Sequence, residues 1–393
     1  MCMIYVDNAA TTKIEEAVVE EMIPFLKEEY GNPSSIYTLG RNARKAVEVA
    51  REQVANAIGA KPNEIYFTSC GSEADNTALK GIAYANQKKG KHIITSQIEH
   101  PAILDTCKAL EKQGFVVSYI PVDEKGIIKI EELEKAITKD TILISVMFAN
   151  NEIGTIQPIE QISKIAKKHG IVFHTDAVQA VGNIPIDVQA LGVDLLSMSA
   201  HKFHGPKGIG ALYVKSGIVF DKFINGGHQE RNKRAGTENV ASIVGMGKAI
   251  ELANEHLTEN IAHMKVLREA YFKQILEKVP YVQINGDREA RLPGNTNVSF
   301  RFIEGESLLL NLDLKGICAS SGSACTSGSL DPSHVLLAIG LPHEIAHGSL
   351  RVTFSKDNTK EEVDRIVESV VEIVQKLRDM SPLYETFLEG GEK

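Results

Sequence analysis

A lysine and an aspartate each follow an apolar segment in the middle of the chain. Asp176 ends the segment IVFHTD, and Lys202 follows LLSMSAH. If both segments are parallel strands of one sheet, their carboxyl ends face the same crevice, where α/β proteins bind ligands. A lysine there could form an imine and a carboxylate could keep a pyridinium nitrogen protonated, which is the pair that pyridoxal phosphate (PLP) requires. Taken alone, a surface lysine and an N-cap aspartate are the more common interpretation.

Two further segments place polar groups where such a cofactor would lie. In YFTSCGSEAD, a helix is expected to begin near Ser72, with Asp75 as its partner in a capping pair. The amides of Gly71 and Ser72 would suit a phosphate, and an ordinary capped helix is the simpler alternative. His100 follows another expected strand and could stack on a ring, act as an acid or base, or be structural.

A cysteine and an arginine near the C-terminal end could act on a substrate. Cys325 lies in SSGSACTSGS, whose Gly and Ser content predicts a mobile loop, and an exposed thiol is more reactive than a packed one. Arg351 lies inside the apolar segment SLRVTF, where its charge needs a partner. That partner could be a substrate carboxylate or an internal salt bridge. The remaining cysteines are interpreted as structural or incidental: Cys2, Cys70, Cys107 and Cys318.

Apolar segments that could position these residues alternate with helix-like stretches between about residues 60 and 215. Their Ile, Val, Phe and Tyr content predicts strands at 64–69, 92–96, 116–122, 141–148, 171–175, 195–199 and 209–214. Apolar spacing predicts helices over 43–58, 130–137 and 158–168, with Pro158 at the first position of the last one. The alternation predicts a mostly parallel sheet covered on both faces.

The pattern changes after about residue 258. A helix, a strand, the Gly/Ser-rich stretch, a second strand and a final helix are predicted there, at 258–279, 297–303, 319–329, 350–354 and 359–379. We therefore expect a large domain at 13–257 and a smaller α+β domain at 258–393 that carries the cysteine loop. The first twelve residues are expected to pack with the small domain.

The composition excludes several classes of protein. The 393 residues are 43% apolar with a net charge of -8, which argues against a general nucleic-acid binder. No apolar run approaches the roughly 18 residues of a membrane span, and no secretory signal is visible. Five cysteines without such a signal indicate a reducing cytosol, so a cytoplasmic protein is expected. Neither a glycine-rich nucleotide motif nor a zinc-ligand spacing occurs.

Taken together, the segments resemble the class V aminotransferase family, and closely its NifS/IscS-like cysteine desulfurases. The resemblance runs in order through YVDNAATT (5–12), GNPSS (31–35), EHPAI (99–103), ANNEIGTIQPI (149–159), HTDAVQAVG (174–182), SAHKFHGPKGIGALYV (199–214), GGHQERNKRAGTEN (226–239) and SSGSACTSGSLDPSHVLLAIGL (320–341). The cysteine loop resembles the NifS/IscS branch rather than the SufS branch. The family implies PLP fold type I, with a large, mostly parallel seven-stranded sheet domain, a smaller α+β domain, and a homodimer.

The resemblance also implies a role for each candidate residue. Lys202 would bind PLP covalently, Asp176 would contact the pyridine nitrogen, and His100 would stack on the ring. The other implied cofactor contacts are Asn151 and Gln179 at the ring hydroxyl, Gly71, Ser72, Ser199 and His201 at the phosphate, and Thr237 at the phosphate of the partner subunit. Arg351, with Asn32 and Asn151, would hold the substrate carboxylate. The phosphate loop reads Cys70-Gly71-Ser72 where relatives commonly have Gly-Ala-Thr, which bears on affinity more than on function.

The activity implied is conversion of L-cysteine to L-alanine, with the sulfur carried as a persulfide on Cys325 for iron–sulfur cluster assembly. A scaffold of the NifU/IscU type would accept the sulfur, and Cys325 could ligate a cluster transiently. The alternatives are a selenocysteine lyase or another class V PLP enzyme. A non-catalytic protein that binds clusters or metal is a third hypothesis, which the cysteine spacing does not support.

Overall fold

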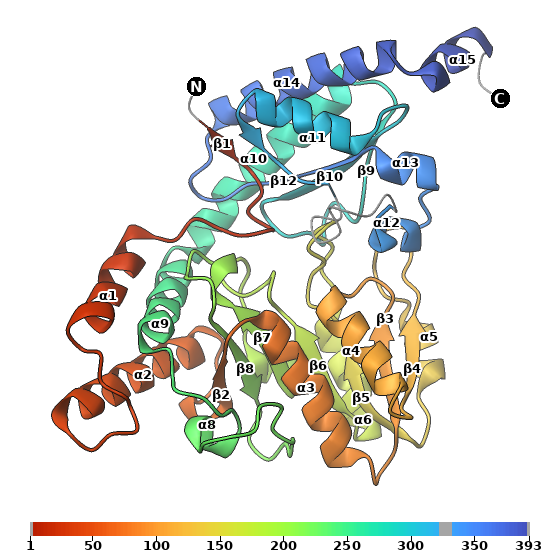
Figure 1. Ribbon diagram of the computed structural model, residues 1–393. Coiled ribbons are helices and arrows are strands. Elements are labelled where there is room, and N and C mark those ends of the chain that lie inside the picture. The colour runs from red at the N-terminus through yellow and green to blue at the C-terminus, as the bar shows by residue number, and fades with distance from the viewer. Residues whose placement is uncertain (1–2, 322–331, 391–393) are drawn as a thin grey trace.

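The computed structural model describes residues 3–321 and 332–390, which form a large lower part and a smaller upper part in Figure 1. Seven strands form the large sheet in the order β2-β8-β7-β6-β5-β3-β4. Their bounds are β2 Ile65–Thr68, β3 His92–Ser96, β4 Val116–Ile120, β5 Thr141–Ser145, β6 Val172–Asp176, β7 Leu195–Ser199 and β8 Gly210–Val214. β8 alone runs opposite to the other six strands of this sheet, so the prediction of a mostly parallel sheet is confirmed.

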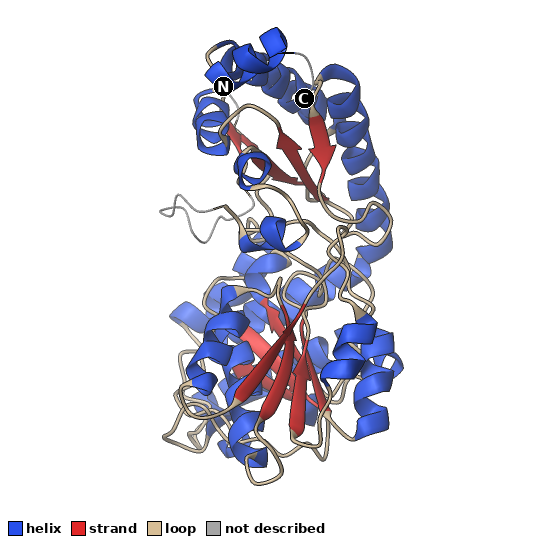
Figure 2. Cartoon of the chain, turned by 90° about the vertical axis from the view of Figure 1, so that its right-hand side faces the viewer, coloured by secondary structure: helices blue, strands red, loops and turns tan. Residues whose placement is uncertain are grey.

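Helices cover both faces of the large sheet, as Figure 2 shows. They are α1 Glu16–Lys27, α2 Thr38–Ala57, α3 Gly71–Asn86, α4 Pro101–Glu111, α5 Ile130–Ala136, α6 Ile159–His169, α7 Val188–Leu191, α8 Gln229–Asn232 and α9 Val240–Glu255, with short 3-10 turns η1 Pro62–Glu64 and η2 Ala200–Lys202. One core lies under α3 and α4, around Leu79 and Leu110. A second core on the opposite face holds Val47, Ile162 and Met246.

One helix start differs from the prediction by a residue. Pro158 is the N-cap of α6 rather than its first helical residue. Its ψ of 63° is not helical, while its carbonyl already accepts the amides of Gln161 and Ile162. A proline at this position has no N–H to lose, so either placement suits the start of a helix.

The upper part is a three-stranded antiparallel sheet in the order β12-β10-β9, with helices packed on it. Its elements are β9 Val282–Ile284, β10 Asn295–Phe300, β12 Ser349–Thr353, α10 Leu257–Lys278, α11 Gly305–Leu314, α14 Lys360–Asp379 and α15 Pro382–Gly390. Two short helices, α12 His334–Ala338 and α13 His343–His347, lie between the two parts, and their buried side chains belong to the core of the lower part. It has a core of its own, which includes Phe300, Leu350 and Val370. These separate cores support a division near residue 258, which stays a prediction.

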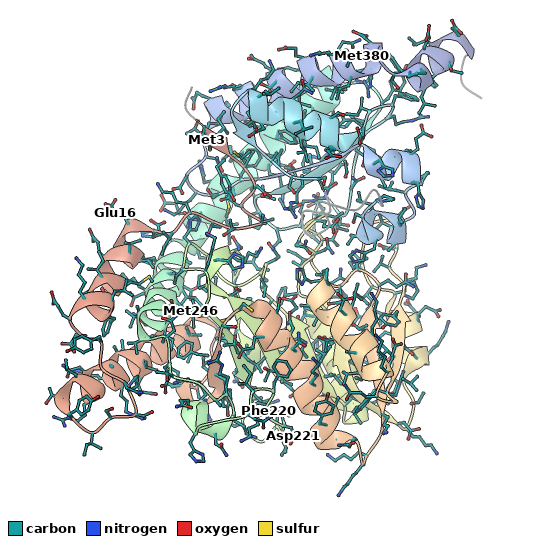
Figure 3. The ribbon with its side chains drawn as sticks, in the orientation of Figure 1. Met3, Glu16, Phe220, Asp221, Met246 and Met380 are labelled. Atoms are coloured by element: carbon teal, nitrogen blue, oxygen red, sulfur yellow. The ribbon has the colours of Figure 1, made fainter. Side chains whose placement is uncertain are left out.

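The N-terminal segment joins the two parts. β1 (Ile4–Tyr5) pairs in parallel with β11 (Ile317–Cys318), and Val6 belongs to the upper core. Figure 3 accordingly places Met3 beside the upper part and Met246 within the lower one. Further along, Ala9 N–H donates to Thr353 Oγ1 (2.9 Å) and Thr12 Oγ1 donates to the carbonyl of His201 (3.0 Å). Residues 3–12 therefore connect the upper sheet to the loop that follows β7.

Within residues 3–321 and 332–390, none of the helices combines the length and the hydrophobicity that crossing a bilayer requires.

Candidate active site

The carboxyl ends of neighbouring parallel strands bring the predicted residues to one edge of the large sheet. Asp176 is the last residue of β6, and Lys202 closes η2 directly after β7. These two strands are hydrogen-bonded neighbours, with Asp176 opposite Ser197. His100 follows β3, which lies two strands away from β6 across β5. Asp176, Lys202 and His100 thus lie at the same edge of the sheet, as the sequence predicted.

Asp176 is a buried carboxylate with little local compensation. It is 6% exposed, and Oδ1 accepts the amide of Val178 at 2.9 Å. Burial raises the pKa of Asp176, while the nearby charges of His100 and Lys202 act in the opposite direction. A cationic group bound beside it would therefore favour its ionised form.

Lys202 is half-buried and points at the N-terminal segment. Its Nζ donates to the carbonyls of Ala9 (2.5 Å) and Ala10 (2.8 Å). A cavity of about 240 Å³ adjoins it, lined also by Asn8 and Gln179. The interpretation of Lys202 as an ordinary surface lysine does not fit these contacts.

His100 is held neutral at the start of α4. Its Nδ1 accepts the amide of Ala102 at 3.1 Å, so the neutral ring carries its proton on Nε2. Burial lowers the pKa of His100, and the charges of Lys202 and His334 lower it further, whereas Asp176 raises it. His334, which sequence reasoning missed, reaches the same region because its Nε2 bonds to the carbonyl of Glu99 at 3.0 Å.

The start of α3 is an open anion cradle. Gly71 is the first helical residue, and the N-cap Cys70 provides no side-chain cap. A β-carbon on Gly71 would lie 2.7 Å from Val178 Cγ2, so the backbone approaches its neighbours closely. The Ser199 hydroxyl is buried and has no hydrogen-bond partner. Free helical amides together with an unpaired hydroxyl suit a phosphate group.

The expected capping pair of Ser72 with Asp75 is wrong. Glu73 makes the local contact instead, because its Oε2 accepts the amide of Ser69 at 2.8 Å and its carboxylate pairs with Arg234. Asp75 is only 1% exposed and points into the core under the helix. Burial of that side chain removes it from the helix end.

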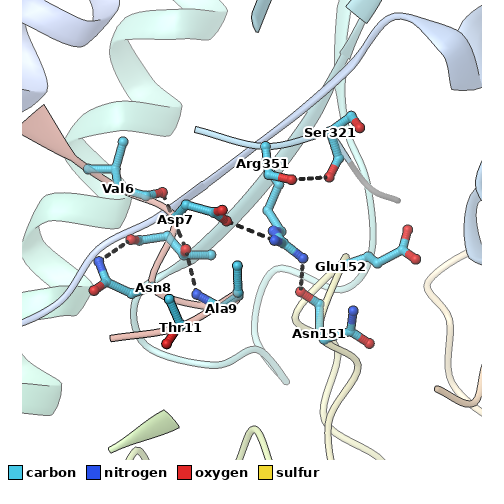
Figure 4. A network of polar contacts seen from close by, with 12 residues as sticks. Val6, Asp7, Asn8, Ala9, Thr11, Asn151, Glu152, Ser321 and Arg351 are labelled. Atoms are coloured by element: carbon cyan, nitrogen blue, oxygen red, sulfur yellow. Dashed lines mark hydrogen bonds and ion pairs between the residues drawn. The ribbon is translucent and has the colours of Figure 1, made fainter. Parts of the chain in front are cut away.

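Arg351 lies on β12 and is 1% exposed (Figure 4). Its Nη2 donates to Asp7 Oδ1 at 2.8 Å and its Nη1 to the carbonyl of Asn151 at 3.1 Å, while Nε is buried without a partner. The salt bridge considered from the sequence is therefore present, with Asp7, a residue that sequence reasoning did not single out. An unpaired donor remains for a further acceptor.

The strand that carries Arg351 also pairs with the segment that leads into the cysteine loop. Its backbone pairs with Ser320, one residue before Ser321, the last residue described ahead of the loop. After the loop, Ser333 Oγ donates to the buried Glu152 Oε2. Burial raises the pKa of Glu152 to about 7, and the charge of Arg351 opposes that rise. Cys325 itself lies outside the described residues.

The family model of the class V aminotransferases matches residues 4–366. The chain belongs to this family. Two similar curated proteins are each named cysteine desulfurase IscS. The one from Clostridium botulinum is 56% identical over 99% of both chains, and the one from Methanosarcina thermophila is 58% identical over 97% of this chain and 94% of the relative. Class V enzymes depend on PLP as a family.

Solved structures agree with this membership. A NifS-like protein superposes with a TM-score of 0.90 at 44% identity, covering 96% of this chain and all of that one. A structure described as SspA in complex with cysteine has a TM-score of 0.80 at 37% identity, covering 90% of this chain and 99% of the other. The class V fold is therefore shown for this chain as well.

Among the other residues predicted to contact the cofactor, Gln179 and His201 contact the N-terminal segment, whereas Thr237 lines a different cavity. Gln179 Nε2 donates to the carbonyl of Ala9 (2.9 Å), beside the contact that Lys202 makes. His201 Nδ1 bonds to Thr11 Oγ1 at 3.2 Å, and burial lowers its pKa to about 4, so it is neutral. Thr237 is exposed and lines a cavity of about 230 Å³ together with Ser69. Its role at the site of a partner subunit stays a prediction.

Asn32 is not brought to Arg351 within the chain. It is exposed in the loop between α1 and α2, away from β12 in Figure 1, and its Oδ1 accepts the amide of Ser34 at 2.9 Å. In the part of the chain that the structure describes, no cluster of three His, Cys, Asp or Glu side chains could hold a metal ion. The predicted cluster ligand, Cys325, falls outside that part.

Proposed function

We propose that this chain is a PLP-dependent cysteine desulfurase that converts L-cysteine to L-alanine and receives the sulfur on Cys325. The observation that carries the proposal is the set of unsatisfied groups at one sheet edge: the open start of α3 with the unpaired Ser199 hydroxyl, next to the buried carboxylate of Asp176. Relatives named cysteine desulfurase, and the SspA structure with cysteine, support this substrate.

The residues present fit PLP. The amides of Gly71 and Ser72 and the Ser199 hydroxyl would bind the phosphate, and Asp176 would keep the ring nitrogen protonated. Lys202 would hold the cofactor covalently through Nζ, since the two carbonyls that now accept from it are replaceable partners. When bound, PLP withdraws electrons from the α-carbon of an amino acid whose nitrogen it holds.

Side chains of the protein would bind the substrate carboxylate and remove the α-proton. Arg351 would take the α-carboxylate, using its free Nε and the nitrogen now paired with Asp7. The amine of Lys202 would remove the α-proton, a role that suits a lysine in a partly desolvated site. The neutral His100 would lie against the ring with its Nε2 proton available as a donor.

Cys325 would accept the substrate sulfur as a persulfide. The described ends of its loop support this role, because Ser320 is paired with Arg351 and Ser333 is bonded to Glu152. Both ends therefore start beside the proposed carboxylate site. We further infer a cytoplasmic homodimer in which Thr237 reaches the partner's phosphate site, a scaffold of the NifU/IscU type as sulfur acceptor, and a supply of sulfur for iron–sulfur clusters.

The test is incubation of the PLP-loaded protein with L-cysteine, followed by detection of alanine and of protein persulfide. We expect both products from the wild type. Cys325→Ser should release alanine at a much reduced rate and form no persulfide at position 325. Lys202→Ala should give neither product. Run in parallel, L-selenocysteine distinguishes a lyase: turnover of selenocysteine with none of L-cysteine would contradict the proposal. A wild type that takes up no PLP would also overturn it.

A further inference from the structure

A strip of buried polar side chains continues inward from Asp176 under α3. His174 precedes Asp176 by two residues on β6, so the two side chains project from the same face of the sheet. His174 is fully buried, and its ring bonds to a serine on each neighbouring strand: Nδ1 to Ser145 Oγ on β5 and Nε2 to Ser197 Oγ on β7, both at 2.9 Å. The strip therefore spans three strands directly beneath the proposed cofactor site.

A second carboxyl group lies over this strip. Asp75 descends from α3 and is 1% exposed. Its Oδ1 lies 3.7 Å from His174 Nε2 and has no hydrogen-bond partner. Buried polar atoms are normally paired, so an orphaned carboxyl oxygen beside an imidazole needs an explanation.

The groups around Asp75 favour one distribution of charge among the buried side chains. Burial raises the pKa of Asp75 well above its usual range, and the charge of Asp176 raises it further, while a hydrogen bond with Ser197 lowers it. Burial also raises the pKa of Glu99 to about 8, which favours its uncharged form at neutral pH, while hydrogen bonds from Ser96 and Met147 act the other way. Burial lowers the pKa of His174 to about 3.

A single proton held by Asp75 and His174 would leave only one negative charge among these buried side chains. If Asp75 and His174 share it, the pair is neutral whichever of them holds it, and Asp176 is the single anion. If the pair lost that proton, two carboxylates would lie close together out of water, and Asp176 would be driven to take up a proton itself. It could then no longer balance a cationic ring nitrogen.

We propose that Asp75 and His174 are positioning residues that retain one proton between them and thereby keep Asp176 ionised for the cofactor nitrogen. The consequence for the cofactor rests on the PLP site proposed above. The coupling among the three side chains does not, because it is a property of the chain without any ligand.

The first experiment follows the chain alone. Histidine labelled with ¹³C at Cε1 is observed by NMR in the apo-protein between about pH 5 and 10, in wild type, Asp176→Asn and Asp75→Asn. We expect the His174 signal to report loss of the shared proton at least about one pH unit lower in Asp176→Asn, because the neighbouring anion is gone. Asp75→Asn is the matched control and should show no such transition.

An equal midpoint in wild type and Asp176→Asn would overturn the proposal. Circular dichroism and thermal unfolding confirm that each variant is folded. A variant that does not fold is replaced by Asp176→Ser, which removes the same charge with a smaller side chain.

The second experiment measures equilibrium PLP binding to the apo-protein. At about pH 7.5, Asp75→Asn should bind within about threefold of wild type, because an amide imitates the protonated carboxyl. By about pH 9.5, wild type should weaken roughly tenfold more than Asp75→Asn, a factor that one pKa unit supplies. Effects of pH on Lys202 are common to both proteins and cancel in the ratio.

Parallel pH profiles for the two proteins would contradict the positioning role. If wild type binds no PLP at any pH, the proposed function fails, and the NMR titration still decides whether the three side chains are coupled.

Discussion

Two fully buried arginines of this chain differ in what their guanidinium groups do. Arg291 is 2% exposed and all three of its side-chain nitrogens donate: Nε to the carbonyl of Asp287 (2.6 Å), Nη1 to Asn295 Oδ1 (3.1 Å) and Nη2 to the carbonyl of Asn285. These acceptors lie within six residues of it. Arg351, 1% exposed, reaches Asp7, 344 residues away, and leaves Nε unpaired.

The difference separates a structural arginine from one prepared for a ligand. Arg291 ties its own loop together, because each of its three side-chain nitrogens already donates to a nearby acceptor. Arg351 keeps a donor and has a carboxylate partner whose side chain is 19% exposed, so the partner can be exchanged. Burial and charge alone, which both residues share, do not distinguish the two roles.

The largest expected effect comes from replacing the ligand-binding arginine. Arg351→Lys keeps the charge but loses the planar fork that matches a carboxylate. We expect kcat/KM for L-cysteine to fall by about a thousandfold, equivalent to about 4 kcal/mol, with PLP binding retained. Steady-state kinetics measures it, and activity within about threefold of wild type would contradict the assignment.

The matched change at the structural arginine should act on stability instead. Arg291→Met removes three hydrogen bonds, and at about 1 kcal/mol for each we expect the free energy of unfolding to fall by about 3 kcal/mol. Denaturant unfolding measures this. The KM for L-cysteine should stay within about twofold of the wild-type value. A large rise in KM without loss of stability would show that Arg291 also binds the substrate and would contradict the distinction between the two arginines.

Replacing Asp7, the carboxylate partner of Arg351, tests whether a substrate carboxylate can take the place of Asp7. Asp7→Asn leaves the guanidinium without its counter-charge, so we expect a stability loss of about 2 kcal/mol, less than for a pair with no remaining acceptor. L-alanine, which presents a carboxylate, should then raise the melting temperature more in the variant than in wild type. Equal shifts in both would show that Asp7 and the ligand do not share Arg351.

The smallest effect is a pH dependence from Glu152, the second carboxyl near Arg351. Its pKa is raised to about 7 in the folded chain, so the folded state holds this proton where the unfolded state does not. That contribution is complete below the unfolded pKa and is lost as pH rises through 7. Between about pH 6 and 8, wild type should therefore lose about 1 kcal/mol of stability relative to Glu152→Gln.

Thermal or denaturant unfolding at the two pH values measures this difference. Binding of L-alanine should weaken over the same range in wild type only, because the ionised Glu152 competes for Arg351. The same pH dependence in Glu152→Gln would assign the effect to another group.

Most of the large sheet could be predicted because its signals are local. All seven strands lie where runs of Ile, Val, Phe and Tyr end at turn residues, and β3 and β7 match the predicted bounds. Helix ends were less accurate: α2 begins at Thr38 rather than at residue 43, and α6 begins one residue after Pro158. The placement of Asp176 and Lys202 at one edge followed from the parallel sheet alone.

The sequence by itself determined the seven strands of the large sheet, its mostly parallel character and the family, since apolar spacing, turn residues and long motifs are all short-range or collinear features. Only the tertiary structure decided which charged side chain meets which. It turned Asp75 into the core instead of capping α3, gave Arg351 a partner from the other end of the chain, and gave each side-chain nitrogen of Arg291 an acceptor. The physical reason is that a buried charge is placed by the packing of distant segments, and nothing in its local sequence encodes their approach.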